Sequence, residues 1–286
     1  MVFVTLHGRL GNYLFEIAAA ATLAAHNNDK FCAVCHDKYN VENQSIWNYI
    51  QRYRNTILKN VTILKTMPED AYEYKPSTFK YKPIPYRENI LLNGGFQSYK
   101  YFDEAIVKDI FRIPSEMETF IREKYSYIFS CPVVGIHVRR GDYCHIPHKL
   151  PVCSKSYIKK AMGYFPKDTR FVFFSDDIKW CKNNFKSDRY YFFESNDAII
   201  DLYAQALCSD NIISNSTFSW WGAYLNSNKN KKVICPTPWF GKFAQNKESD
   251  VEDLIPKEWI QIPNHMDFRM WIRAKKMEFL TIIGKV

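Results

Sequence analysis

The sequence lacks long apolar runs, and its basic residues are dispersed along the chain. No window of about 18 apolar residues occurs, so no segment is expected to span a membrane. The N-terminus, Met-Val-Phe-Val-Thr-Leu-His-Gly, has neither a charged start nor a long apolar segment, so a secretory signal peptide is not expected. No run of five or more basic residues is present, which gives little support to nucleic-acid binding.

Cysteine content, charge and length narrow the class of protein further. The 8 cysteines, in a chain without a secretory signal, are expected to be reduced thiols, which predicts a cytoplasmic protein. The formal net charge of +9 suits nucleic acid, an anionic membrane surface or an anionic small substrate, and charge alone does not separate these partners. The 286 residues are enough for one large domain or two of moderate size.

The stretch 133–143 carries the strongest local signal. It begins as an apolar, β-branched run that predicts a buried strand, and it ends in His137, Arg139, Arg140 and Asp142. Open parallel sheets bind ligands at the carboxyl edge of their strands, and guanidinium groups fit phosphate oxygens. The paired arginines therefore indicate a phosphate or diphosphate site. A surface salt-bridge cluster at a strand end explains the same residues equally well.

A strand–helix–strand unit is predicted at the start of the chain. A buried strand at 2–6 precedes a turn at 7–12, an apolar helix follows, and the next strand is expected at 31–35. The turn has the pattern Gly-x-x-Gly-Asn, where a helix N-terminus can receive a phosphate. It lacks the dinucleotide pattern Gly-x-Gly-x-x-Gly, so NAD binding is not predicted.

Strands and helices alternate in the second half, which predicts a doubly wound parallel sheet. The expected strands are 133–138, 170–175, 190–193, 211–214 and 232–235. In the first half, an irregular loop is expected over 66–89. A helix is expected near Pro114, capped by Ser115 and Glu118.

Two further loops follow predicted strand ends in the second half. In 174–177, a carboxylate of Asp176 or Asp177 could accept the amino and imino protons of guanine, although Ser and Asp also serve as helix N-caps at such positions. In 213–222, hydroxyl groups at a helix start could hold an anion, although capping above a tryptophan core would also explain them. Because three such loops are expected at one sheet edge, a nucleotide-diphosphate pocket is the preferred interpretation.

Five motifs occur in order and span residues 1 to about 240. They are Gly8-x-x-Gly-Asn with Leu14-Phe15, Gly95-Phe-Gln-Ser98 with Lys100-Tyr-Phe102, His137-Val-Arg-Arg-Gly-Asp-Tyr143, Phe174-Ser-Asp-Asp177, and Asn215-Ser-Thr-Phe-Ser-Trp-Trp-Gly-Ala223. Together they resemble the α-1,2-fucosyltransferases of glycosyltransferase family 11. The family commonly shows smaller or other residues in place of His7 and Arg9, and glutamine in place of Glu16. These departures bear on the acceptor more than on the donor.

The resemblance implies an α/β, GT-B-like fold of two Rossmann-type parallel-sheet domains facing a cleft. The expected division is an acceptor-side domain over 1–128, a donor-binding domain over 129–245, and a tail over 246–286 that packs back on the N-terminal domain. The implied reaction transfers L-fucose, with inversion, from GDP-L-fucose to O2 of a terminal β-galactose on an oligosaccharide. No cofactor is implied, because GDP-L-fucose is a substrate.

The same resemblance supplies roles for individual residues. Arg139 would contact the β-phosphate, Asp176 would hold guanine, and Asn12 would hold the diphosphate or fucose. Further donor-binding residues are expected at Gly11, His137, Arg140, Ser216, Thr217 and Phe218.

The chemistry of the implied reaction places negative charge on GDP as the fucose–phosphate bond breaks, and fixed cations and N–H groups would stabilise that charge. The sequence has no Asp-x-Asp motif, so arginine and a helix dipole are expected in place of a metal. The base for the acceptor hydroxyl is expected at Asp142, with Glu16 and His7 as further candidates. Asp142 could equally be an ion-pair partner that orients Arg139 or Arg140.

The tail at 266–286 is basic and amphipathic. It could touch an anionic membrane peripherally, although packing on the first half is the preferred interpretation. The segment Cys32-Ala-Val-Cys35-His36 matches a haem-attachment motif, but a predicted buried strand there favours buried thiols. The alternatives to an α-1,2 enzyme are a fucosyltransferase of another linkage and a non-catalytic glycan- or nucleotide-binding protein.

Overall fold

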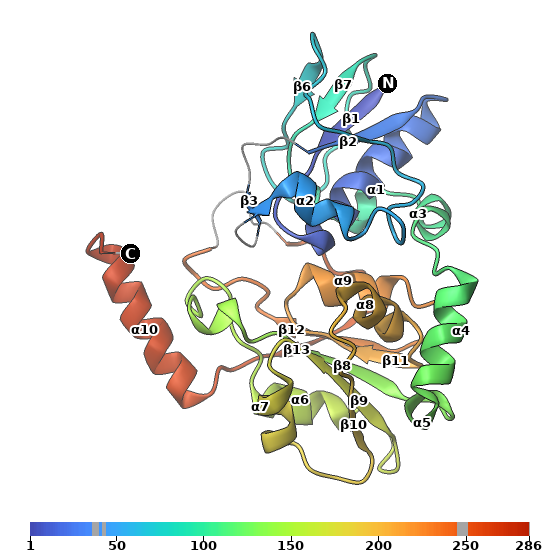
Figure 1. Cartoon of the computed structure of the whole chain (residues 1–286). Helices are drawn as coiled ribbons and strands as arrows, with labels where there is room; N and C mark the ends of the chain where they lie inside the picture. Colours follow the sequence, from blue (N-terminus) through green and yellow to red (C-terminus); the bar gives the residue numbers. More distant parts are fainter. Residues whose placement is uncertain (36–39, 42–43, 245–250, 286) are drawn as a thin grey trace. The chain divides into compact units, whose positions relative to one another are not determined.

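The computed structural model describes residues 1–35, 40–41, 44–244 and 251–285 (Figure 1). The chain divides into two compact units: unit 1 is Met1–Pro114 with Lys247–Pro256, and unit 2 is Ser115–Asn246 with Lys257–Val286. Each unit contains a parallel sheet with helices, which confirms the predicted α/β class. The domain boundaries predicted after residues 128 and 245 stay predictions, and residue 245 lies outside the described residues.

Unit 1 is organised around a parallel sheet with the strand order β5-β2-β1-β7-β6. Its elements are β1 (Val2–Thr5), α1 (Leu10–His26), β2 (Phe31–Val34), β3 (Asn40–Val41), β4 (Gln44–Ser45), α2 (Ile46–Gln51), β5 (Ile63–Leu64), β6 (Tyr72–Tyr74), β7 (Ile90–Leu92), η1 (Tyr99–Tyr101) and α3 (Glu104–Ile110). The central strand, β1, is buried along its whole length. The chain order changes direction between β1 and β7, the kind of position where open α/β sheets bind ligands.

Unit 2 contains a second parallel sheet, with the order β10-β9-β8-β11-β12-β13. Its elements are α4 (Ser115–Lys124), α5 (Ser126–Phe129), β8 (Val134–Val138), η2 (Asp142–Cys144), α6 (Lys155–Met162), β9 (Phe171–Ser175), α7 (Ile178–Asn184), β10 (Tyr190–Phe192), α8 (Ala198–Ala206), β11 (Asp210–Ile212), α9 (Thr217–Tyr224), β12 (Val233–Thr237), β13 (Ile260–Pro263) and α10 (Phe268–Ile282). β8 is buried at all of its residues. The direction of the strand order changes between β8 and β11, so the loops after β8, β9 and β11 end beside one another.

Side-chain caps fix where several helices of unit 2 begin. Asp177 accepts the N–H of Trp180 at 3.1 Å at the start of α7, and Ser154 accepts the N–H of Tyr157 at 3.0 Å at the start of α6. Each oxygen satisfies an N–H group that has no partner inside its helix. The capping interpretation of the 174–177 loop therefore holds for Asp177.

The predicted strands lie within a few residues of those found. The strands that were not predicted are the antiparallel pair β3–β4 and two edge strands of the parallel sheets. β6 lies inside 66–89, which was expected to be irregular, and β13 was not expected at all. Each pairs with one neighbour only, β6 with β7 and β13 with β12. One side of each strand is unpaired, and two of the three β6 side chains are exposed. Neither segment therefore needs the apolar pattern by which buried strands are recognised.

The chain ends in α10, which belongs to unit 2 and is drawn in red in Figure 1. The predicted amphipathic tail is thus a helix over most of its length. Throughout the described part of the chain, no helix has the length and apolar character needed to cross a membrane.

Candidate functional site

The loops after β8 and β9 meet in a charged group, here called the arginine centre, that consists of Arg139, Arg140, Asp142, Asp176 and Asp177. The Arg139 guanidinium lies between two carboxylates, 2.6 Å from Asp142 Oδ1 and 2.8 Å from Asp176 Oδ2. Nε of Arg140 donates to Asp177 Oδ2 at 3.0 Å, and the Arg140 backbone N–H donates to Asp176 Oδ1 at 2.9 Å. These contacts fix the direction of both guanidinium forks.

The three carboxylates of the arginine centre differ in their exposure to solvent. Asp142 is 47% exposed, whereas Asp176 is 25% exposed and makes two contacts to the arginine pair. The Arg139 guanidinium also lies over the Tyr143 ring, 5.4 Å from its centroid. An incoming anion can therefore replace Asp142 at Arg139 while Asp176 and Tyr143 keep the guanidinium in place. The salt-bridge cluster of the alternative interpretation is therefore present, and the anion-binding roles of its arginines stay predictions.

His137, at the end of β8, connects the arginine centre to the loop after β11. Its Nδ1 lies 2.8 Å from Ser214 Oγ, and its ring lies 5.7 Å from that of Phe218 on α9. Burial, and secondarily the charge of Arg139, lowers the pKa of His137 to about 3. The imidazole is therefore neutral at physiological pH and acts as a hydrogen-bonding link.

The start of α9 supplies the polar groups of the loop after β11. Ser216 is the N-cap residue, yet its side chain makes no capping hydrogen bond. Thr217 and Phe218 form the first turn and are partly exposed, whereas Trp220 and Trp221 behind them are fully buried. Both features predicted for this loop are therefore present: buried tryptophans, and hydroxyl groups at the start of the helix. The phosphate-binding roles of Ser216, Thr217 and Phe218 stay predictions.

A second polar group lies in unit 1, where His7 follows β1. The Glu16 carboxylate accepts the backbone N–H of His7 at 3.0 Å, and its other oxygen lies 3.2 Å from His7 Nδ1. Glu16 is completely buried, which raises its pKa to about 7, and its contacts with His7 oppose that rise. His7 is 28% exposed, so this residue, and not Glu16, can meet a ligand. Two of the three positions that depart from the family pattern, His7 and Glu16, are thus in direct contact.

The turn between His7 and α1 depends on Gly8. Its φ of +72° is in the left-handed region, and a Cβ atom there would lie 2.6 Å from Asn12 Nδ2. Asn12 in turn accepts from Gln97 Nε2 at 3.5 Å, which connects the turn to the loop after β7. Gln97 is 7% exposed, and its Oε1 has no hydrogen-bond partner among the described residues. Unit 1 therefore presents His7, Asn12 and Gln97 where its strand order changes direction.

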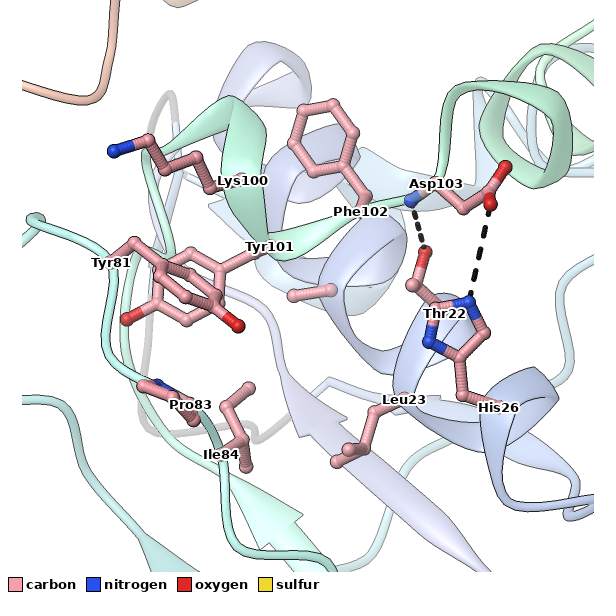
Figure 2. A pocket seen from close by; sticks show the side chains of 11 residues that line it. Thr22, Leu23, His26, Tyr81, Pro83, Ile84, Lys100, Tyr101, Phe102 and Asp103 are labelled. Carbon is pink, nitrogen blue, oxygen red and sulfur yellow. Dashed lines mark hydrogen bonds and ion pairs between the residues drawn. The ribbon is translucent and has the colours of Figure 1, made fainter.

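A hollow of about 340 Å³ lies elsewhere in unit 1 (Figure 2). It is lined by Ala19, Thr22, Leu23, His26, Tyr81, Pro83, Ile84, Lys100, Tyr101, Phe102 and Asp103. The first α1 residue in its lining, Ala19, is seven positions after Asn12, which is about 10 Å along the helix axis. The polar groups of the hollow engage one another, since Thr22 accepts the Asp103 backbone N–H at 3.0 Å. The hollow is thus separate from the polar group at the sheet edge.

Sequence reasoning identified most of these residues and one pairing, because Asp142 was named as a possible ion-pair partner of Arg139. It grouped Arg139, Arg140 and Asp176 correctly at one sheet edge. It did not identify Ser214 as the partner of His137, or Gln97 as the partner of Asn12. Gln97 belongs to the motif Gly95-Phe-Gln-Ser98, and this motif was the signal in the sequence that could have identified it. Gly11 is buried in the first turn of α1, and its donor-binding role stays a prediction.

Three of the relatives each match more than 90% of the chain. The O-antigen biosynthesis glycosyltransferase WbnK of Escherichia coli is 26% identical over 91% of this chain and 100% of its own length. The alpha-1,2-colitosyltransferase of E. coli is 27% identical over 92% and 99%, respectively. The galactoside alpha-(1,2)-fucosyltransferase 2 of Oryctolagus cuniculus is 22% identical over 92% and 77%.

Among solved structures, the alpha-1,6-fucosyltransferase NodZ soaked with GDP-fucose superposes with a TM-score of 0.51. It is 17% identical, and the match covers 78% of this chain and 92% of that one. At this identity the likeness concerns the fold, and it confirms the predicted GT-B-like class. The sequence profile of glycosyl transferase family 11 matches residues 1–263. The chain therefore belongs to glycosyl transferase family 11.

Proposed function

We propose that the protein transfers L-fucose from GDP-L-fucose to O2 of a terminal β-galactose on an oligosaccharide. Family membership supports glycosyl transfer, and the names of two relatives support an α-1,2 linkage. The observation that carries the donor assignment is the arginine centre. It holds two oriented guanidinium groups where the strand order of unit 2 changes direction, and the start of α9 follows the neighbouring strand β11.

In the donor complex, the diphosphate takes the place of Asp142 at the Arg139 guanidinium. Arg140 and the start of α9 complete the cationic surroundings of the phosphates, and Asp176 keeps Arg139 in position. The negative charge that develops on GDP as the sugar–phosphate bond breaks then meets groups that are already oriented. Asp176 keeps lone pairs for guanine, because each of its oxygens accepts only one of the contacts described.

For the acceptor, we place the general base at His7. Ionised Glu16 accepts the Nδ1–H of His7, which leaves Nε2 as the basic nitrogen. The acceptor O2–H gives its proton to Nε2 as O2 attacks C1 of fucose, and GDP leaves with the electrons of the broken bond. We prefer His7 to Asp142 because Glu16 orients the His7 ring, whereas the diphosphate displaces Asp142 from its partner Arg139. Asp142 remains the alternative base.

The direct test is incubation of the protein with GDP-L-fucose and a panel of β-galactosides, with and without EDTA. The expected product carries fucose on galactose O2, and its yield is unaffected by EDTA because arginines stabilise the leaving group. Product linked at another hydroxyl would reject the linkage. Loss of product with EDTA would reject the role given to the arginines, and absence of product with every acceptor would reject the transfer reaction.

A second candidate donor sugar is colitose, because a relative at 27% identity is named as an alpha-1,2-colitosyltransferase. The two donor sugars can be compared as their GDP derivatives at equal concentration with one galactoside acceptor. A higher kcat/KM for GDP-L-fucose is expected under our proposal. A higher value for the colitose donor would reassign the sugar and leave the arginine centre unchanged.

Gly141 offers a test of how Asp176 is positioned. A Cβ atom at Gly141 would lie 2.5 Å from Asp176 Oδ2, so Gly141→Ala should displace the carboxylate from Arg139. We expect GDP affinity, measured by calorimetry, to fall about 10-fold, because one charge-assisted contact that orients Arg139 is lost. Gly163→Ala, at the end of α6, is the control. Unchanged GDP affinity in Gly141→Ala would remove Asp176 from the donor site.

A further inference from the structure

The largest group of exposed apolar side chains on one helix lies on α10. Phe268, Trp271, Ile272, Phe279 and Ile282 are each between 48% and 73% exposed. They recur at the spacing of one helical face. Ala274, in the same helix, is 1% exposed, so α10 packs on unit 2 through a different face.

Two polar contacts hold the other side of α10 on unit 2. Arg273 lies 3.2 Å from His145 Nδ1, and the Thr281 hydroxyl lies 3.4 Å from His148 Nε2. The exposed apolar face is therefore presented by a helix that is fixed to its unit. Residues 264–286 also lie beyond the family profile, which ends at residue 263. The face therefore lies outside the part of the chain that the family profile matches.

The charges of α10 distinguish between the surfaces that could cover this face. Arg269, Arg273, Lys275 and Lys276 are its basic residues, and Glu278, paired with Lys275 at 2.6 Å, is its acidic one. Lys275 is seven positions after Phe268 and therefore lies on the apolar face itself. The core of a protein interface is depleted of lysine, whereas helices that lie in a membrane surface combine lysine and arginine with exposed aromatic residues.

We propose that α10 docks the protein on the surface of a membrane that contains anionic lipid. The helix lies in the plane of the interface, with its aromatic and aliphatic side chains among the headgroups and upper acyl chains. The basic side chains beside them meet the lipid phosphates. This inference does not depend on the sugar that the protein transfers.

The test is sedimentation of the full-length protein with vesicles of phosphatidylcholine, with and without phosphatidylglycerol. Wild type should bind the anionic vesicles and not the neutral ones. Phe268→Ser with Phe279→Ser should weaken binding on the order of 10-fold, because both rings leave the interface. Arg269→Gln with Lys276→Gln should weaken it on the order of 25-fold, since each basic residue contributes about 5-fold.

Phe120→Ser on α4 is the matched control, because Phe120 is an exposed helical phenylalanine that is 41% exposed. It should bind like wild type. Melting temperature and gel filtration of every variant exclude unfolding as the cause. Absence of wild-type binding, or equal binding to neutral vesicles, would overturn the proposal. A wild-type dimer that the paired Phe268 and Phe279 changes dissociate would assign the face to a second copy of the chain instead.

Discussion

Replacing Arg139 with alanine is expected to lower kcat/KM for transfer by about 1,000-fold or more, because the transition state loses a guanidinium that was already oriented toward the leaving diphosphate. In the free protein the same change leaves Asp142 and Asp176 without their shared cation. Two carboxylates that have lost this cation then face the incoming phosphates, which adds repulsion to the lost attraction. Initial rates at varied donor concentration measure the effect.

Two further variants separate charge from geometry. Arg139→Lys keeps the positive charge but loses the fork that contacts two carboxylates, so an intermediate loss is expected. Arg189→Ala is the control, because Arg189 contacts the Thr169 carbonyl at 2.8 Å, away from the arginine centre, and should transfer like wild type. A value for Arg139→Ala within tenfold of the control would contradict the donor assignment.

Replacing Glu16 with glutamine is expected to lower kcat/KM for the acceptor by about 100-fold or more. The glutamine amide would donate to His7 Nδ1, which moves the ring proton to Nε2 and removes the basic lone pair there. His7→Ala should cause a loss of similar size, and the two changes together should cost little more than either alone. Full activity of Glu16→Gln would reject this pair as the base.

The raised pKa of Glu16 also links transfer and stability to pH. Transfer should decrease as the pH falls through about 7, because the carboxylate that accepts from His7 becomes protonated. The effect on stability has the opposite sign. From pH 4.5 to about 7 the folded chain holds a proton that the unfolded chain has released, so stability decreases as the pH rises through this window.

The melting temperature of Glu16→Gln should therefore increase relative to that of wild type as the pH rises, although the variant is less active. Thermal melts of both proteins across this pH window measure the difference. A constant difference between the two proteins would show that Glu16 does not titrate as described.

The grouping of the arginine-centre residues could be predicted from the sequence, because the sheet topology brings the ends of their strands together. Strands that run parallel in one sheet end at one edge, so residues after β8, β9 and β11 had to meet there. The pairing within that edge was predicted only in part, because Asp142 was named as a possible ion-pair partner of Arg139 or Arg140 but Asp176 was not. Arg139 could have paired with any of several nearby aspartates, and the choice depends on the small space that Gly141 leaves for Asp176.

The His7–Glu16 contact was beyond sequence reasoning for a different reason. The two residues were separate candidates for the base, and their contact requires the left-handed turn at Gly8. It also requires a carboxylate on the buried side of α1, an alanine-rich helix whose pattern predicts an apolar face. The short edge strands β6 and β13 were missed because their pairing, more than their composition, defines them.

We assign donor binding to the arginine centre and proton transfer to His7. Calorimetric measurement of the Kd for GDP in wild type, Arg139→Ala and His7→Ala tests this assignment. We predict that Arg139→Ala loses GDP affinity and that His7→Ala binds GDP like wild type, although both lose transfer. Wild-type GDP affinity in Arg139→Ala, or an equal loss of affinity in His7→Ala, would contradict the account.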